Sequence, residues 1–163
     1  MSLRVGVDLG ATKIQTLLVA DDNSIVARKR GATPATGGPS AVLAAVQETI
    51  EQLLARADQR ASAVATIGIG APGQIDATAG VVLQAVNIAG WDQPITVAAI
   101  VGEMFGVPVA LANDVQASMV AEQLRKSAPA SRRNPHGVAL AKAKYVRPKR
   151  PRGLHANASK AWR

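Results

Sequence analysis

The fold of this chain is decided by its opening segment, Leu3-Arg-Val-Gly-Val-Asp-Leu-Gly-Ala-Thr-Lys-Ile-Gln-Thr-Leu-Leu-Val-Ala20. Its apolar, β-branched stretches, residues 3–9 and 14–20, predict two strands joined by a tight turn. The cluster Asp21-Asp-Asn-Ser24 is a second turn signal, and residues 25–30 can form a third strand. The chain therefore opens with an antiparallel β-meander, which is an unusual start for a dinucleotide-binding fold.

Strands and helices alternate after the meander. A linker rich in Gly, Pro and Thr runs from Gly31 to Pro39, and Pro39 suits the first position of a helix. An amphipathic helix is predicted by apolar residues at helical spacing: Val42, Leu43, Val46, Ile50, Leu53, Leu54 and Ala57. The further expected elements are a strand over 64–70, a short strand near 81–86, a helix from Pro94 to Phe105 closed by Gly106, a strand over 107–112 and a helix after Asp114. This order predicts an α/β domain with a mixed sheet and helices on its faces.

Composition limits the class of protein. A chain of 163 residues with 48% apolar residues is long enough to bury a core and is not wholly disordered. Its apolar runs are shorter than the roughly 18–20 residues of a membrane-spanning helix. The lack of cysteine excludes a disulfide framework, a thiolate nucleophile and Cys-ligated zinc. Since Asp8 interrupts the first apolar run, no secretory signal is expected, and we expect a cytoplasmic protein without a membrane partner.

Two polar motifs stand where predicted strands end. The turn Asp8-Leu-Gly-Ala-Thr-Lys13 can form an anion-binding concavity of backbone N–H groups, with Asp8 placed to hold a hydrated Mg²⁺ beside phosphates. The same residues also suit an ordinary hairpin turn with a capping Asp. The second motif, Leu111-Ala-Asn-Asp114, ends an apolar strand at the place where ligands collect in open α/β sheets. Asn113 and Asp114 are equally good helix N-caps.

Two glycine-containing loops lie between these motifs. Gly68-Ile-Gly-Ala-Pro-Gly73 matches GxGxxG, but residues 74–80 lack the apolar helical stripe that dinucleotide binding requires. A Gly/Pro-shaped turn that faces a small ligand is the better interpretation. In Asn87-Ile-Ala-Gly-Trp-Asp92, the Asn87 amide can donate to and accept from sugar hydroxyls, and Trp91 can shape a pocket wall. The alternative is a loop that Trp91 anchors.

Taken in order, these four motifs resemble the ROK family of sugar kinases and repressors, with the spacing of its glucokinase-like members. The resemblance extends over about 120 residues. It implies a ribonuclease-H-like, actin-type kinase fold, with two such domains and an active site in the cleft between them. It also implies ATP and Mg²⁺ as cofactors, a hexose as substrate and a homo-oligomeric intact enzyme.

The resemblance assigns roles residue by residue. The family's first phosphate motif matches Asp8, Gly10, Thr12 and Lys13, with Ala11 where the family usually has a second glycine. Its sugar-contacting positions match Gly73, Asn87, Asn113 and Asp114. Asp114 also matches the general base, which would accept the proton of a sugar hydroxyl, expected to be the 6-OH of a hexose. No dedicated metal site is expected.

The charge changes sign near Leu124. Residues 1–124 hold seven basic and eleven acidic residues, a net charge of −4, whereas residues 125–163 hold twelve basic residues and no acidic one. The family's later motifs, Gly-Thr-Gly-x-Gly-Gly-Gly, Glu-x-Gly-His and often a Cys-rich zinc site, do not occur in the sequence. We therefore expect a kinase-type domain over residues 1–124, a basic tail of low order over residues 125–163, and no kinase activity from this chain alone.

Three interpretations of the tail remain open. It is an out-of-frame or foreign end of a disrupted kinase gene, a basic segment that binds nucleic acid, or a solvated extension without a specific partner. Tyr145 and Trp162 are its only aromatic residues for stacking on bases. Two functions are thus weighed: the N-terminal part of an ATP-dependent hexose kinase, and a non-catalytic module whose tail binds nucleic acid.

Overall fold

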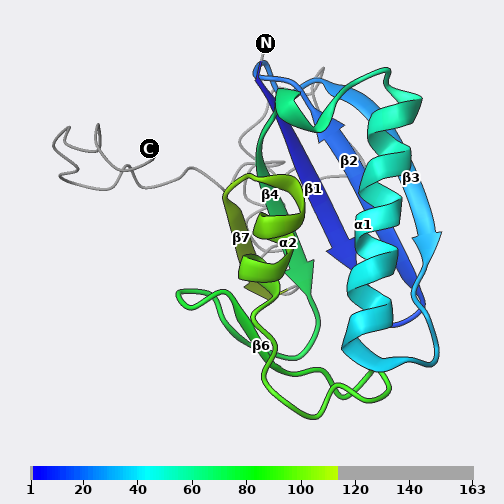
Figure 1. The fold of residues 1–163 in the computed structure, drawn as a ribbon, viewed down its shortest axis with the longest axis vertical. Helices are drawn as coiled ribbons and strands as arrows, with labels where there is room; N and C mark the ends of the chain where they lie inside the picture. The colour runs from blue at the N-terminus through cyan, green and yellow to red at the C-terminus, as the bar shows by residue number, and fades with distance from the viewer. Residues whose placement is uncertain (1, 114–163) are drawn as a thin grey trace, which may run out of the picture.

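The structure, a computed structural model, describes residues 2–113. Its main sheet has five strands in the order β3-β2-β1-β4-β7. Their bounds are β1 Leu3–Leu9, β2 Lys13–Val19, β3 Ile25–Ala32, β4 Val64–Ala71 and β7 Val109–Asn113. The strand pairs β1–β2 and β2–β3 are antiparallel, whereas β1–β4 and β4–β7 are parallel. The predicted meander and mixed sheet are therefore confirmed (Figure 1).

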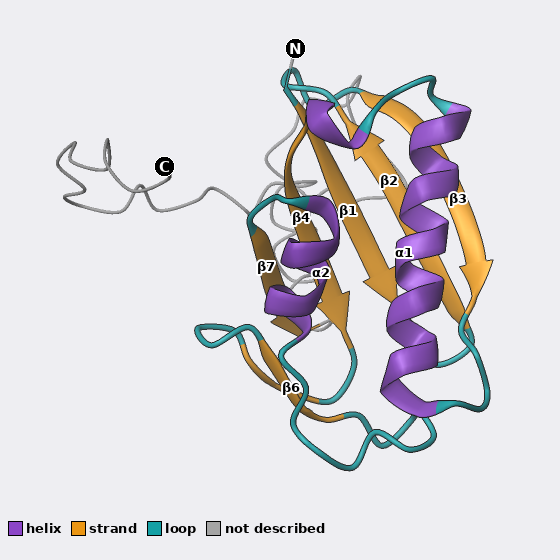
Figure 2. Ribbon diagram, in the orientation of Figure 1, coloured by secondary structure: helices purple, strands orange, loops and turns teal. Residues whose placement is uncertain are grey.

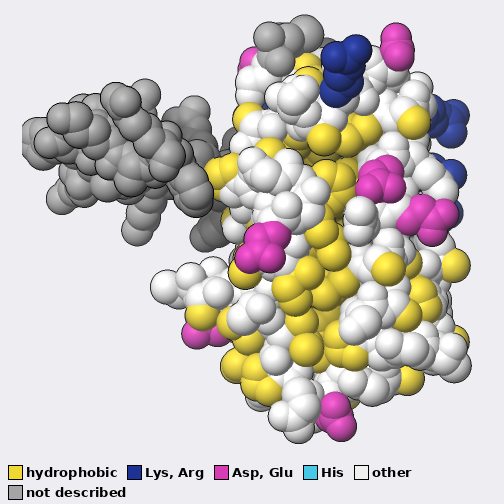
Figure 3. Space-filling model, viewed as in Figure 1, with side chains coloured by type: hydrophobic (Ala, Val, Ile, Leu, Met, Phe, Trp, Pro, Cys, Tyr) yellow, Lys and Arg dark blue, Asp and Glu magenta, His cyan; other side chains and the backbone are white. Residues whose placement is uncertain are grey.

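Two helices, α1 (Gly38–Arg56) and α2 (Val97–Phe105), lie on the same face of this sheet (Figure 2). The buried residues of α1 are Val42, Leu43, Val46, Thr49, Ile50, Leu53 and Leu54. All of them except Thr49 share one core with the alternate β1 residues Leu3, Val5, Val7 and Leu9. Between α1 and α2, hydrophobic side chains gather at the surface (Figure 3). The predicted apolar stripe of α1 is thus confirmed, with burial of each large side chain stabilising the fold by roughly 1.5–3 kcal/mol.

The opposite face of the sheet is lined by small residues where the parallel strands meet. The register aligns Gly6 with Gly68 and, on the far side of β4, Gly68 with Ala110. In the next row of this face, Asp8 pairs with Gly70. The neighbour of Asp8 in β4 is thus a glycine, which contributes no side chain beside the carboxylate.

Several element boundaries differ from the sequence-based prediction. The second helix begins at Val97 instead of Pro94, because Ile95 exchanges two backbone hydrogen bonds with Val82, at 2.9 and 3.0 Å, and stays extended. Strand β3 continues through Ala32, which shortens the predicted linker. Pro39 occupies the second helical position, after Gly38.

The short strand predicted near residues 81–86 is confirmed, whereas its hairpin partner and a single helical turn were not predicted. Strand β5 (Gln74–Asp76) pairs antiparallel with β6 (Val81–Gln84), and η1 spans Ala61–Ala63. Three-residue segments are too short to show a period, so sequence patterning could not detect them. The predicted close of α2 by Gly106 is confirmed, since Gly106 has a φ of 66° and donates its N–H to the Gly102 carbonyl at 2.8 Å.

The predicted helix after Asp114 and the basic tail of residues 125–163 lie outside the described residues, as does the proposed boundary at Leu124. In the described segment, none of the helices has both the length and the apolar character to cross a bilayer.

Candidate active site

The carboxyl ends of the parallel strands bring the predicted motifs to one edge of the sheet. Asp8 of β1 pairs with Gly70 of β4, and Ala71 of β4 pairs with Asn113 of β7 (Figure 1). Ligands of open α/β sheets bind at this edge, because the loops that follow the strands converge there. The turn of residues 10–13, called here the phosphate turn, the glycine-containing loop of residues 68–73 and strand β7 therefore lie at the same end of the sheet.

The turn between β1 and β2 is open to solvent on one side. Ala11, Thr12 and Lys13 are exposed, and Gly10 donates its N–H to the Lys13 carbonyl at 2.9 Å. Within residues 2–113, the N–H groups of Ala11 and Thr12 have no hydrogen-bond partner. A side chain at Gly10 would place its Cβ 3.1 Å from the Lys13 carbonyl oxygen, so glycine suits the tight approach. The turn therefore offers backbone donors, a hydroxyl and a cation to an anion.

A residue outside the predicted site secures this turn. Thr33 follows β3, and it donates its hydroxyl to the Gly10 carbonyl at 2.7 Å and its N–H to the Thr12 carbonyl at 3.1 Å. Thr33 is not among the predicted site residues, because a Thr before a Pro at the end of a strand has no motif of its own. The only available signal was its place in the Gly/Pro/Thr-rich segment.

Two of the predicted sugar-contacting residues touch each other. Asn113 donates its Nδ2–H to the Gly73 carbonyl at 2.7 Å. Gly73 has a φ of 92°, and a Cβ there would overlap the Gln84 carbonyl oxygen at the end of β6. The loop of Gly73, the end of β6 and the end of β7 therefore meet around Gly73. The Asn113 side-chain amide helps to hold this loop in place.

Asn87 lies on the adjoining loop after β6. This loop is closed by backbone hydrogen bonds from Ile88 to Ala85 at 2.9 Å and from Ala85 to Trp91 at 3.3 Å. The side chain of Asn87 is exposed. Asn87 thus lies in the loop after β6, the strand whose end Gly73 approaches. Within the described part, Asn87 forms no hydrogen bond with Gly73 or Asn113. Asp114, the predicted general base, lies just beyond the described residues.

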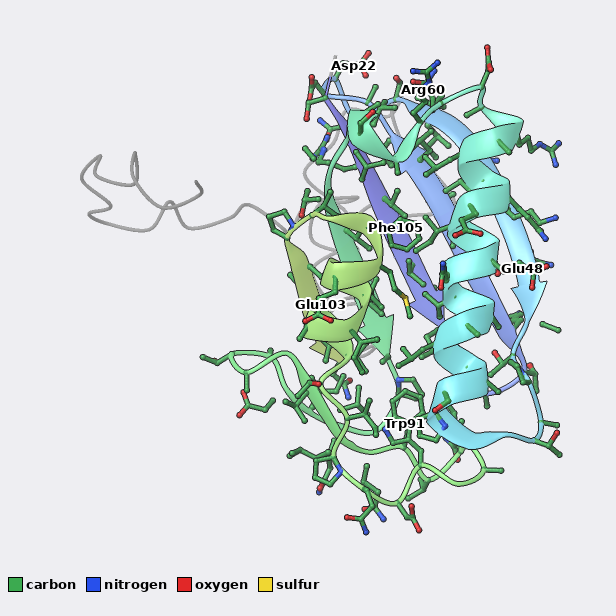
Figure 4. All side chains as sticks on the ribbon, in the orientation of Figure 1. Asp22, Glu48, Arg60, Trp91, Glu103 and Phe105 are labelled. Atoms are coloured by element: carbon green, nitrogen blue, oxygen red, sulfur yellow. The ribbon has the colours of Figure 1, made fainter. Side chains whose placement is uncertain are left out.

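Trp91 anchors the loop that carries Asn87. Its side chain is 2% exposed and belongs to the main core, near the amino-terminal end of α1 (Figure 4). Its indole Nε1 is buried and has no hydrogen-bond partner among residues 2–113. Of the two interpretations weighed from the sequence, loop anchoring fits this burial better than a solvent-facing pocket wall.

Asp8 is the candidate metal ligand at this end of the sheet. Residues 2–113 contain no group of three or more His, Asp or Glu side chains close enough to hold a metal ion. Asp8 is half-buried at the end of β1, directly before the phosphate turn. One carboxylate combined with substrate phosphates is a common way to bind Mg²⁺. Asp8 therefore fits a Mg²⁺ ion that arrives with a nucleotide.

Comparison with known proteins places this geometry in a family. The sequence profile of the ROK family matches residues 4–132. A glucokinase from Streptomyces coelicolor is 31% identical over 118 residues, which cover 72% of this chain and 34% of that relative. A glucokinase from Streptomyces lividans matches to the same extent. The chain thus spans about a third of the length of these curated relatives.

Solved structures agree with the profile. The ROK hexokinase from Thermus thermophilus is 34% identical with a TM-score of 0.65, over 74% of this chain and 38% of that chain. A ROK family glucokinase from Streptomyces griseus, solved in complex with glucose and AMPPNP, is 29% identical with a TM-score of 0.62, over 74% and 36% of the two chains. The mixed sheet is accordingly that of the actin-type kinases. The chain belongs to the ROK family.

Proposed function

We propose that residues 1–124 form the N-terminal domain of a glucokinase-like kinase that transfers the γ-phosphate of ATP to a hexose hydroxyl. The observation that carries the proposal is the meeting of Asp8, the open phosphate turn and the Asn113–Gly73 contact at one edge of the sheet. Because the later family motifs are absent from the sequence, we propose that this chain is inactive by itself. The proposal includes a cytoplasmic, homo-oligomeric intact enzyme.

Phosphoryl transfer depends mainly on positioning and charge neutralisation. In the proposed site, backbone N–H groups of residues 11–13 would bind phosphate oxygens, with the Thr12 hydroxyl and the Lys13 ammonium beside them. Asp8 would hold Mg²⁺, which supplies positive charge next to the phosphates when bound. These groups align the γ-phosphate toward the sugar at the same sheet edge.

The sugar would bind at the Gly73 backbone and the Asn87 and Asn113 side chains. Asp114 follows Asn113 directly, so its carboxylate would accept the proton of the attacking hydroxyl. The sugar oxygen forms a bond to the γ-phosphorus, the bond to the bridging β-phosphate oxygen breaks, and ADP leaves with that electron pair. The products are a hexose phosphate, ADP and the proton on Asp114.

The role of Asp114 is tested by Asp114→Asn in a version of this chain that is fused to the second domain of a ROK glucokinase. We expect kcat to fall by about 10²–10⁴-fold, because a positioned general base contributes that much, while KM for glucose changes little. The matched control is Glu51→Gln on the exposed face of α1, which should leave kcat unchanged. Near-normal turnover of Asp114→Asn, measured by coupled ADP release, would reject this role.

The 163-residue chain offers a direct binding test. If the sugar-contacting half of the site is formed, glucose should raise its melting temperature by mass action, whereas glycerol at equal concentration should have a smaller effect. Equal shifts with the two compounds would speak against hexose recognition by this domain.

We propose nucleic-acid binding as a second candidate function. The observation that favours it is the concentration of twelve basic residues without an acidic one in residues 125–163. Such a segment would bind phosphates by releasing counterions, without sequence preference.

A further inference from the structure

Thr33 connects the end of β3 to both ends of the phosphate turn. Its side chain is largely buried, with 8% exposed, and its hydroxyl donates to the Gly10 carbonyl at 2.7 Å. Its backbone N–H donates to the Thr12 carbonyl at 3.1 Å. The two accepting carbonyls lie on either side of Ala11, so one residue determines the orientation of two peptide planes.

The orientation of these planes decides where the turn's N–H groups point. In a trans peptide the carbonyl and the following N–H are directed to opposite sides, and the described chain has no cis peptide bond. Because the Gly10 carbonyl faces Thr33, the N–H of Ala11 is directed away from Thr33. Likewise, the Thr12 carbonyl directs the N–H of Lys13 away. Both donors therefore face the side that Thr33 does not cover.

The hydroxyl of Thr33 also replaces the usual closure of the turn. In a closed β-turn the carbonyl of the first residue accepts a hydrogen bond from the N–H of the fourth, here from Lys13 to Gly10. Among the described residues this bond is not formed, and the Gly10 carbonyl accepts the hydroxyl of Thr33 instead. The Lys13 N–H is thus kept out of the turn's own hydrogen bonding.

We propose that Thr33 is a positioning residue of the phosphate site, which holds the turn Gly10–Lys13 so that the N–H groups of Ala11 and Lys13 face the phosphates of a nucleotide. The nature of the ligand rests on the proposed kinase function, whereas the orientation of the turn rests on the hydrogen bonds alone. Pro34 favours an extended Thr33, and the β-branch of Thr33 restricts its rotamer, so the hydroxyl is pre-oriented.

The first test needs no ligand. In the full chain, Thr33→Val keeps the side-chain shape and removes the hydroxyl, Thr33→Ser restores it, and Thr36→Val is the matched control on the exposed part of the same loop. We expect the carbonyl ¹³C shift of Gly10 and the amide ¹⁵N shift of Ala11 to move in Thr33→Val only. Unchanged shifts in Thr33→Val would overturn the proposal. If this variant fails to fold, Thr33→Ala provides the same comparison.

The second test measures the consequence for binding. The affinity of each variant for MgATP is obtained from amide shifts of residues 10–13 in a titration. We expect Thr33→Val to bind about 5–10-fold more weakly, as for the loss of one hydrogen bond that organises a site, with Thr33→Ser and Thr36→Val within about 2-fold of the original chain. Equal affinity of Thr33→Val would overturn the positioning role. Absence of MgATP binding by the unsubstituted chain would instead contradict the proposed function, and the carbonyl shifts would still decide the orientation of the turn.

Discussion

Gly73 illustrates how a single residue shapes the candidate sugar site. Its φ of 92° is accessible to glycine but strained for other residues, and a side chain there would overlap the Gln84 carbonyl oxygen. The carbonyl of the same residue accepts the hydrogen bond from Asn113 at 2.7 Å. The absence of a side chain therefore lets the loop approach both β6 and β7.

We expect Gly73→Ala to destabilise the domain more than Gly106→Ala. Both positions have positive φ, so each substitution costs roughly 1–2 kcal/mol of backbone strain. A Cβ at Gly106 meets no atom within 4 Å, whereas at Gly73 overpacking adds about 1–3 kcal/mol. Urea unfolding of the full chain, followed by circular dichroism, measures the difference. Equal losses in the two variants would mean that the Gly73 loop can move aside.

At the scale of elements, helix α1 approaches strand β3 closely at Gly31. A Cβ at Gly31 would lie 2.5 Å from the Thr49 hydroxyl oxygen. Thr49 is 4% exposed, and its hydroxyl is satisfied within the helix by the Ala45 carbonyl at 2.7 Å. The pair Gly31–Thr49 thus sets how near the helix lies to the strand that leads to Thr33.

A double-mutant cycle tests this contact. We expect Gly31→Ala alone to lower the free energy of unfolding by about 1–3 kcal/mol, because the helix must shift to admit the methyl group. In a Thr49→Ala background the same substitution should cost less, with an interaction energy of about 0.5–3 kcal/mol from denaturant unfolding. Additive effects of the two substitutions would show that the helix accommodates the methyl group without contacting Thr49.

At the scale of the whole molecule, charge divides the chain. The net charge of +8 combines −4 over residues 1–124 with twelve basic residues over residues 125–163. The family relationship concerns mainly the first part, since the ROK profile matches residues 4–132. The proposed kinase function therefore depends on residues 1–124, whereas the proposed nucleic-acid binding depends on residues 125–163.

We expect the full chain to bind single-stranded DNA without sequence preference and in a salt-dependent manner. Replacing four tail cations by Gln should make the slope of log affinity against log salt concentration less negative by about 3, at roughly 0.7 per lost phosphate contact. The four residues are Arg147, Lys149, Arg150 and Arg152. Replacing four cations outside the tail, Arg28, Lys29, Arg30 and Arg56, is the matched control. Fluorescence anisotropy measures both. If only the control changes the slope, nucleic acid binds the folded domain instead of the tail.

Local patterns were sufficient for the longer elements and insufficient where distant segments pair. The stripe of α1 and the meander have clear periods, because each side chain's burial repeats along the element. The predicted start of α2 at Pro94 was wrong, since Ile95 pairs with Val82, a residue far outside its local window. The candidate site residues were named from motifs, but their mutual contacts were not predictable from those motifs.

The sequence by itself determined the α/β class, the succession of the main strands along the chain, the charge division near Leu124 and the polar residues at the strand ends. Only the tertiary structure decided that Thr33 secures Gly10 and that Asn113 holds Gly73, across 23 and 40 positions of the chain. The physical reason is that a hydrogen bond requires its two groups within about 3 Å. Strand order and register bring these groups together, and neither is written in the local pattern of either segment.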